Sequence, residues 1–272
     1  SWARDVYKRQ MLKFDLPGLL SWIDLLFGSS NERIYSLAKK ALHSLFKFNT
    51  SDTELYHEVF KKCIFDQKIS IIENYYVIIT EALLEANEYP IKRHQVLLLG
   101  FYGCGCNNYE IRTAAMKLLI DAEKKLFGTE LVNSFTERVM NKNKTIYKRA
   151  SLDISAYFAS SHPEENIFLI SELTMYFHIV SFESRRDILT VLIPWLQTVE
   201  LHVTDDDIDI QSYMVLSNLF EITIKFSDSI PNEIEALWIS LGNGANFANI
   251  DAILRFSVRA SLLKRNPLFV EF

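Results

Sequence analysis

Residues 108 to 127 read NYEIRTAAMKLLIDAEKKLF, and they give the clearest indication of the fold. Apolar side chains recur in this stretch every three or four residues, at Ile111, Ala115, Leu118, Ala122 and Leu126. That interval places them on one face of an α-helix and does not fit the alternation of a β-strand. Lysines followed by Gly128 are a typical helix stop. We therefore expect a helix over residues 108–127.

The same helical spacing recurs along most of the chain. A second apolar stripe is predicted at Ile34, Leu37, Ala41, Leu45 and Phe48. Ser51 and Glu54 form a capping-box pattern, and Pro163 with two following glutamates suits a first helical turn. Residues 75–80 and 220–226 are rich in β-branched and aromatic residues, but lone strands would have no partners, so helix is preferred. The expected helices cover residues 16–27, 31–48, 52–66, 69–87, 91–102, 108–127, 130–140, 144–160, 164–178, 183–198, 210–227, 232–241 and 247–264.

Taken in pairs, these helices repeat. Helix starts near residues 31, 69, 108, 144 and 183 recur at the spacing of HEAT or armadillo-type helical pairs. One such pair cannot bury its apolar face alone, so neighbouring pairs must stack into a solenoid. The sequence thus predicts an all-α, HEAT/armadillo-like helical-repeat solenoid fragment, with an acidic insertion at 201–208.

The two ends of the chain differ from its middle. Residues 1–10 lack an apolar period and resemble a translated adapter, so we expect a non-native or disordered leader there. The chain ends in an apolar segment, 266–270, that resembles the start of another element. Residues 11–272 are therefore expected to form a single helical-repeat segment, truncated at both ends.

Composition excludes several classes of protein. The 8 glycines and 6 prolines among 272 residues are less than half of average usage, roughly 12%, which indicates long helices with few turns. A net charge of −5 gives no reason to expect a nucleic-acid partner. The longest apolar run, 96–106, is too short to span a bilayer. Three cysteines and no secretory signal favour a cytoplasmic location with reduced thiols.

Two motifs that could bind a ligand fail on their spacing. Asp205, Asp207 and Asp209 alternate as at the start of a calcium loop, but Ile210 and Leu216 stand where glycine and glutamate are required. Gly100, Gly103 and Gly105 resemble a phosphate loop, but neither the Walker nor the dinucleotide spacing is met. We expect a solvated acidic loop and a tight interhelical turn, in which glycine tolerates a positive φ.

Metal and catalytic chemistry find no support in the sequence. Cys104 and Cys106 have no second cysteine pair and no histidine close by, so they are expected to be small buried residues. The six histidines form no recognised metal motif, and no nucleophile signature is present. We expect no cofactor, no metal and no enzymatic activity.

One charged stretch could contact a partner. From residue 138 to residue 149 every charge is basic, and Asn141, Asn143 and Tyr147 are interleaved. A surface that binds an anion or a protein partner is one interpretation, and a solvated helix end is the alternative. The candidate protein-binding residues are Arg138, Lys142, Lys144, Lys148 and Arg149.

Residues 188–201, ILTVLIPWLQTVEL, combine a helical apolar stripe with a proline inside it. Trp195 is expected to be packed in the core, and Pro194 to perturb its helix. This stretch resembles a signature segment of the Furry-type cell morphogenesis proteins. The resemblance covers most of residues 90–265 and is strongest at 194–201, and it continues in 170–174, 215–223, 225–228 and 236–238.

The resemblance implies a fragment of a very large, non-enzymatic helical-repeat scaffold. Such proteins work with NDR-family kinases and their Mob coactivators in polarised growth and cell morphogenesis, at the cell cortex or sites of growth. Abundant Asn, Lys, Ile and Phe suit a fungal member. The family supplies no catalytic motif to carry over. The alternative function is a HEAT-repeat transport receptor or cargo adaptor, which would show acidic side chains along one concave face.

Overall fold

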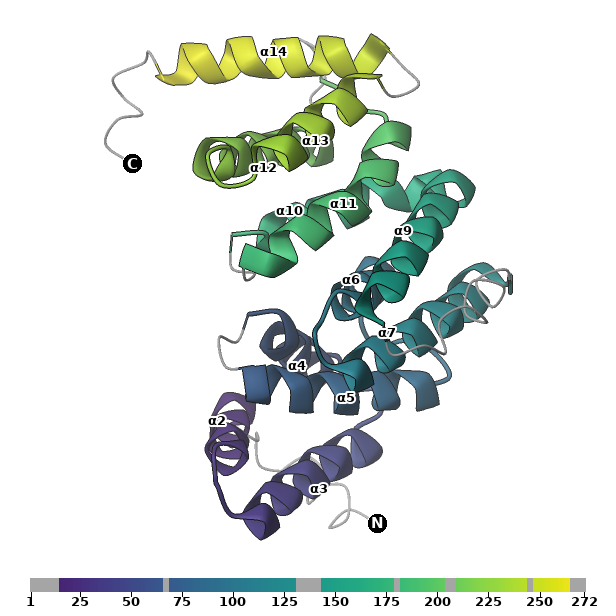
Figure 1. The fold of residues 1–272 in the computed structure, drawn as a ribbon, viewed down its shortest axis with the longest axis vertical. Coiled ribbons are helices and arrows are strands. Elements are labelled where there is room, and N and C mark those ends of the chain that lie inside the picture. The colour runs from purple at the N-terminus through teal and green to yellow at the C-terminus, as the bar shows by residue number, and fades with distance from the viewer. Residues whose placement is uncertain are drawn as a thin grey trace, which may run out of the picture. The chain divides into compact units, whose positions relative to one another are not determined.

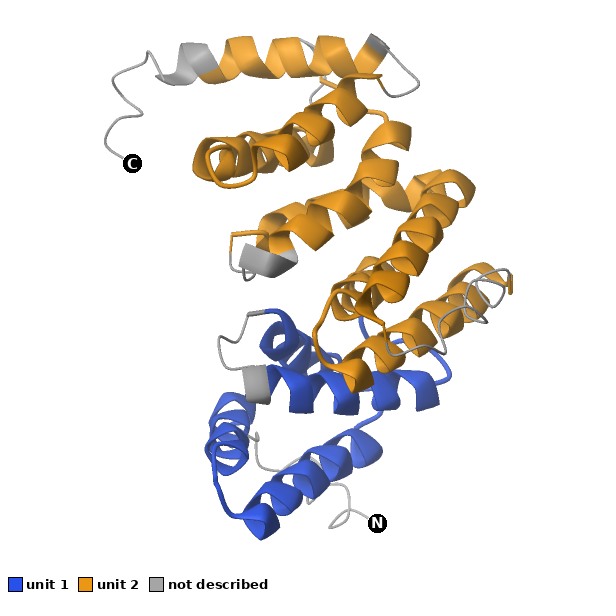
Figure 2. Ribbon diagram, in the orientation of Figure 1, with its two compact units in different colours: residues 1–91 blue, residues 92–272 orange. Residues whose placement is uncertain are grey.

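The computed structural model describes residues 15–65, 69–130, 143–178, 182–203, 209–243 and 247–264. All regular elements in these ranges are helices (Figure 1). The chain divides into two compact units, residues 1–91 and residues 92–272 (Figure 2). The predicted leader at 1–10, most of the helix expected at 130–140, and residues 204–208 of the acidic loop lie outside the described residues.

The first unit contains four described helices: α2 (Leu16–Phe27), α3 (Glu32–Phe48), α4 (Thr53–Phe65) and α5 (Ile69–Glu85). Helices α2 and α3 pack on each other and both contact α5, which also packs against α4. Edge-to-face aromatic contacts hold this core, since the Tyr75 ring lies 5.5 Å from Phe27, and Phe27 lies 5.8 Å from Tyr35. The Tyr75 hydroxyl donates to the Leu20 carbonyl at 3.2 Å.

The prediction that the apolar stripe on α3 is its buried face is wrong. The buried face of α3 carries Ala38, Leu42 and Phe46, whereas Leu37 is 61% exposed and Phe48 is 80% exposed. Helix α3 has apolar residues on two adjoining ridges, and only the ridge that meets α2 and α5 is covered. Helical periodicity alone does not say which ridge that is.

The second unit contains the remaining helices. They are α6 (Arg93–Cys104), α7 (Tyr109–Ala122) with a π-helical turn (Glu123–Phe127), α9 (Lys144–Ser161), a 3-10 turn (Pro163–Glu165), α10 (Asn166–Tyr176), α11 (Phe182–Thr198), α12 (Ile210–Phe226), α13 (Pro231–Asn243) and α14 (Phe247–Lys264). Helix α6 packs on α7, and later helices contact the helix two elements on: α10 contacts α12, α11 contacts α13, and α12 contacts α14. Such contacts are the pattern of stacked helical pairs.

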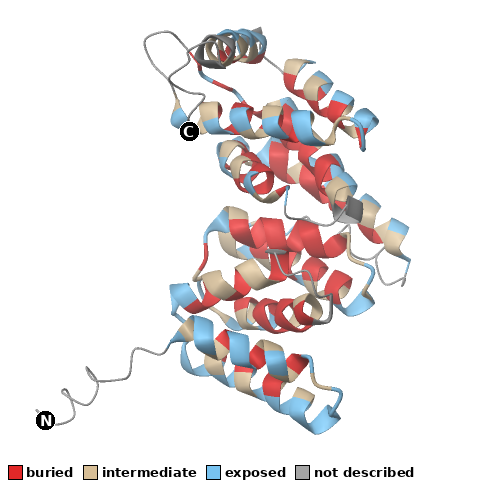
Figure 3. Cartoon of the chain, turned by 90° about the vertical axis from the view of Figure 1, so that its left-hand side faces the viewer, coloured by how far each residue is buried: buried red, intermediate tan, exposed pale blue. Residues whose placement is uncertain are grey.

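The predicted repeat spacing is confirmed. Helices α3, α5, α7, α9 and α11 begin at residues 32, 69, 109, 144 and 182. Four residues of the stripe predicted over 108–127 are buried on α7: Ile111, Ala115, Leu118 and Ala122. The fifth, Leu126, lies in the π-helical turn and is half-buried. Buried residues follow the faces that helices turn toward their neighbours (Figure 3). The described chain is thus an all-α helical-repeat structure, as the sequence predicts.

The glycines around residue 103 do not form the predicted positive-φ turn. Gly100 and Gly103 lie inside α6, and Gly105 caps it with φ −81°. Among the described residues a positive φ occurs only at Gly128, which ends the π-helical turn with φ 71°. Gly100 instead permits close packing, because a Cβ there would lie 2.5 Å from Cδ2 of Leu119 on α7. The residues that make the turn between α6 and α7 are 105–108.

Two predicted helix starts are corrected by local hydrogen bonds. Helix α4 begins at Thr53, and Asp52, not Ser51, caps it by accepting from the amides of Glu54 (3.1 Å) and Leu55 (3.2 Å). Aspartate is one of the preferred residues at a helix start, and its negative charge also interacts favourably with the positive end of the helix dipole. Pro163 begins a 3-10 turn, and α10 follows it from Asn166.

Candidate functional site

The candidate basic surface lies at the start of α9. Asn143 caps this helix, and its side chain accepts from the Thr145 amide at 2.9 Å. The cap places Lys144, Lys148 and Arg149 in the first two turns of α9. The other two candidates, at positions 138 and 142, are outside the described residues. Three of the five predicted residues are thus brought together by one helix.

Two of these lysines are held by neighbouring elements. Lys144 Nζ donates to Asn107 Oδ1 at 2.6 Å, which ties α9 to the turn between α6 and α7. Lys148 Nζ lies 2.5 Å from Asp187 Oδ1 on α11. A Cβ at Gly105 would approach Asp187 Oδ2 to 3.1 Å, so glycine leaves room for this carboxylate. Asp187 therefore offsets the charge of Lys148.

Arg112 is buried and contacts both the α6–α7 turn and α9. Arg112 Nη1 donates to the carbonyls of Cys106 (2.9 Å) and Asn107 (2.6 Å), which fixes the α6–α7 turn. Its guanidinium lies 5.9 Å from the Tyr109 ring centroid and 5.2 Å from that of Tyr147. Burial raises the pKa of the Tyr147 hydroxyl, which bonds with Thr113 at 3.2 Å. Arg112 thereby links the α6–α7 turn to the Tyr147 ring in the first turns of α9.

The electrostatics of this surface favour an anionic group. The start of an α-helix carries the positive end of its dipole, and Lys144 and Arg149 add two cations to it. Arg149 is exposed. Carboxylates or phosphates are the groups that such an arrangement attracts. We call the surface formed by Lys144, Lys148 and Arg149 the α9 basic edge.

Sequence reasoning missed a buried polar cluster between α6 and α10. Gln95 Nε2 donates to Glu172 Oε1 at 2.9 Å, and His94 Nε2 lies 3.2 Å from Glu172 Oε2. Burial tends to raise the pKa of Glu172, but the hydrogen bonds from His94 and Gln95 outweigh it, and the net pKa is lowered. Burial and the Glu172 carboxylate raise the pKa of Tyr176 to about 12. The only sequence signal is an Arg-His-Gln run ahead of an apolar helix, and it does not identify Glu172.

Two other residues singled out in the sequence, Cys104 and Asp209, have roles in packing and helix capping. Cys104 is fully buried, and burial raises the pKa of its thiol to about 12. Asp209 caps α12, accepting from the Ser212 amide at 2.9 Å and the Ser212 hydroxyl at 2.6 Å, and these bonds lower its pKa against the effect of burial. In the part of the chain that the structure describes, no group of three or more His, Cys, Asp or Glu residues could hold a metal ion. No helix within those ranges could cross a membrane.

Stacked helical pairs with charged edges define the class of this chain as a helical-repeat protein. Comparison with known families goes further: the model of the "Cell morphogenesis central region" matches residues 28–264. The chain therefore belongs to the Furry-type cell morphogenesis family, as the sequence resemblance indicates.

Two fungal relatives are similar over nearly the whole chain. Cell morphogenesis protein PAG1 of Saccharomyces cerevisiae is 34% identical over 264 residues, which are 96% of this chain and 11% of the relative. Cell polarity protein mor2 of Schizosaccharomyces pombe is 31% identical over 261 residues, 95% of this chain and 12% of the relative. The chain thus spans about a ninth of the length of these relatives.

Proposed function

We propose that this chain is part of a non-enzymatic scaffold that supports NDR-family kinase and Mob signalling in cell morphogenesis. The observation that carries the proposal is family membership across residues 28–264. The printed names of the two fungal relatives concern morphogenesis and polarity. The kinase and its coactivator enter through the resemblance to the Furry-type family. We place this activity at the cell cortex or at sites of polarised growth.

A helical-repeat segment can act in such a pathway without chemistry of its own. A scaffold that holds a kinase near its activator replaces a bimolecular encounter by a local one, at an effective concentration set by the tether. Stacked helices supply an extended surface for this purpose. In our proposal the α9 basic edge contacts an acidic or phosphorylated segment of the kinase complex.

The test is direct binding between purified components. The chain is immobilised, and a purified NDR-family kinase bound to its Mob coactivator is titrated at physiological salt. We expect Arg149→Glu to weaken binding about fivefold, since it reverses one exposed interfacial charge. Lys117→Glu is the matched control, because Lys117 is an exposed cation on α7 outside the edge.

Each outcome bears on a separate part of the proposal. Absence of binding by the unaltered chain contradicts a kinase contact in this segment. Binding that both variants weaken equally supports the scaffold but contradicts the α9 basic edge as the contact. Turnover of a substrate by the purified chain would contradict a non-enzymatic role.

A further inference from the structure

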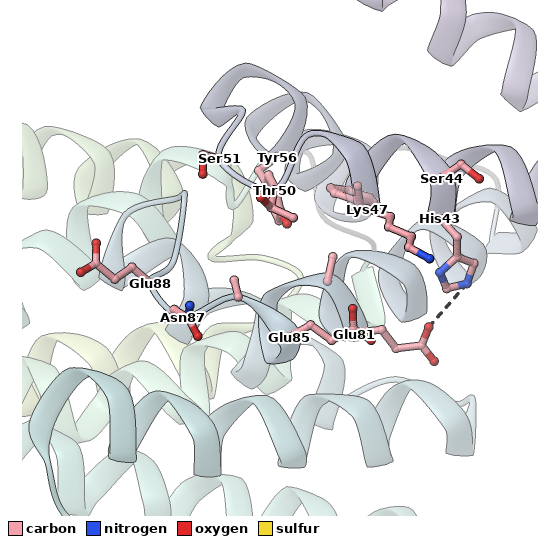
Figure 4. A pocket seen from close by; sticks show the side chains of 13 residues that line it. His43, Ser44, Lys47, Thr50, Ser51, Tyr56, Glu81, Glu85, Asn87 and Glu88 are labelled. Carbon is pink, nitrogen blue, oxygen red and sulfur yellow. Dashed lines mark ion pairs between the residues drawn. The ribbon is translucent and has the colours of Figure 1, made fainter.

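A pocket of about 800 Å³ lies in the first unit, between the ends of α3 and α5 (Figure 4). One side is formed by the last turns of α3 and the turn that follows, including His43, Lys47 and Thr50. The other is formed by the end of α5 and the residues after it, 81–88. This volume lies in the range of pockets that hold a small ligand or a few residues of a peptide. We call it the α3–α5 pocket.

Negative charge predominates in the α3–α5 pocket. Glu81, Glu85 and Glu88 line it, against a single lysine and His43. His43 Nε2 lies 3.5 Å from Glu81 Oε2, whereas Glu85 and Glu88 are exposed and have no ion pair among the described residues. Two carboxylates at its rim are therefore available to a cation.

The helix ends add to this negative field. Both α3 and α5 end at the α3–α5 pocket, so the negative ends of two helix dipoles meet there. The last turn of α5 has no basic residue and carries Glu85, a charge that the dipole disfavours at that end. The positive dipole end of α4 is its N-terminus, and the Asp52 carboxylate already caps it. A local arrangement that lowers stability is typical of a site that is completed by a ligand.

A tyrosine on α4 adds a hydroxyl group to the lining of the α3–α5 pocket. Tyr56 is 1% exposed, its side chain lines the pocket, and its ring packs against Phe46 at 4.7 Å. Its hydroxyl is not one of the buried side-chain atoms that lack a partner, and it is therefore open to the pocket that the residue lines. Burial and the charge of Glu85 raise the pKa of this hydroxyl, which keeps it protonated. A hydroxyl that faces an open pocket can form a hydrogen bond with a polar group of a bound chain.

We propose that the α3–α5 pocket binds a segment of a partner protein that carries lysine or arginine residues. The cationic side chains meet Glu85 and Glu88, and the Tyr56 hydroxyl bonds with a polar group of the bound segment. The pocket is far larger than a metal ion, and no three-residue metal cluster occurs among the described residues. This proposal stands on the first unit alone and does not depend on the kinase proposal.

The test measures fluorescence anisotropy of a short fluorescein-labelled peptide of alternating arginine and alanine, titrated with the full chain. The double variant Glu85→Gln with Glu88→Gln keeps the side-chain shape and removes both charges. We expect it to bind about fivefold more weakly, as the loss of two exposed ion pairs predicts. The matched control is Glu32→Gln with Glu73→Gln, which gives the same net charge from positions on α3 and α5 outside the pocket.

A second variant separates binding from folding. Tyr56→Phe removes the hydroxyl and keeps the ring, so its urea midpoint should equal or exceed that of the unaltered chain, while its affinity for the peptide falls. Equal affinity in the two double variants would show attraction to an acidic chain in general and overturn the proposal. Failure of the unaltered chain to bind the arginine peptide would also overturn the proposal. Preferential binding of a glutamate–alanine peptide would overturn it too, and would indicate an anion site at Lys47.

Discussion

Trp195 on α11 donates from its indole Nε1 to the hydroxyl of Ser155 on α9, at 2.7 Å. The same hydroxyl donates to the Val191 carbonyl at 2.6 Å. Pro194, which has no N–H, lies inside α11. Trp195 and Ser155 are both fully buried, and the Trp195 ring meets Phe101 of α6 edge-to-face at 6.3 Å. One serine thus joins two helices beside a proline.

Ser155→Ala should destabilise the second unit by about 1–3 kcal/mol, because the buried indole N–H and the Val191 carbonyl both lose their side-chain partner. Urea unfolding followed by tryptophan fluorescence measures the change. Trp195→Phe removes the donor and also leaves a smaller ring in the core. The double variant should lose less free energy of unfolding than the sum of the losses in the two single variants, because both single changes remove the same hydrogen bond. Strict additivity would contradict the coupling.

Gly100→Ala should destabilise the second unit by about 1–3 kcal/mol, since the new Cβ would lie 2.6 Å from Cγ of Leu119. Leu119 is fully buried, so either its side chain must leave its present rotamer in a packed core or α6 and α7 must separate. Gly242→Ala is the matched control, because it lies in α13 with open space around the position. Alanine there should stabilise by up to about 1 kcal/mol. Thermal unfolding that responds alike to both changes would contradict close packing at Gly100.

The order and starts of the helices could be predicted because both depend on local patterns. Apolar spacing and stop residues predicted the helical stretch that forms α7 and the π-helical turn after it, and its end at Gly128. The burial of Trp195 also followed from its stripe. The covered ridge of α3 could not be predicted in this way, since Leu37 and Ala38 are neighbours in sequence and only tertiary packing exposes one and buries the other.

The candidate sites depend more on contacts between distant residues. The α9 basic edge was visible as a run of like charges, but the compensation of Lys148 by Asp187 comes from another helix. The α3–α5 pocket joins the ends of two helices with a turn, and none of the three is distinctive in sequence. His94 and Glu172 likewise meet only through packing of α6 on α10.

Acid should weaken the contact between α6 and α10. The pKa of Glu172 is lowered from its ordinary value of 4.5 in the folded chain, so ionisation favours folding. This contribution is complete above the unfolded pKa and is lost as the pH falls from there through the folded pKa. Stability measured from neutral pH to below pH 4.5 should fall less steeply in Glu172→Gln than in the unaltered chain. Glu235→Gln, at an exposed position on α13, should retain the steep fall.

Asn249 of α14 is fully buried and bonds with three backbone groups, two of them in residues 199–201 and one at Leu241. Its Oδ1 accepts from the Leu201 amide at 2.8 Å, and its Nδ2 donates to the carbonyls of Val199 (2.9 Å) and Leu241 (3.2 Å). Asn249→Asp keeps the shape and the acceptor but replaces both donors by an oxygen that faces two carbonyls. We expect a loss of about 2–4 kcal/mol at neutral pH, because a buried charge then opposes two acceptors. Protonation of the new carboxyl restores one donor, so the deficit should shrink as the pH is lowered. Asn249→Ala has no titrating group at this position, so its loss of stability should not shrink as the pH is lowered. Urea unfolding of both variants over the same pH range distinguishes them; parallel curves would contradict the donor role of Nδ2.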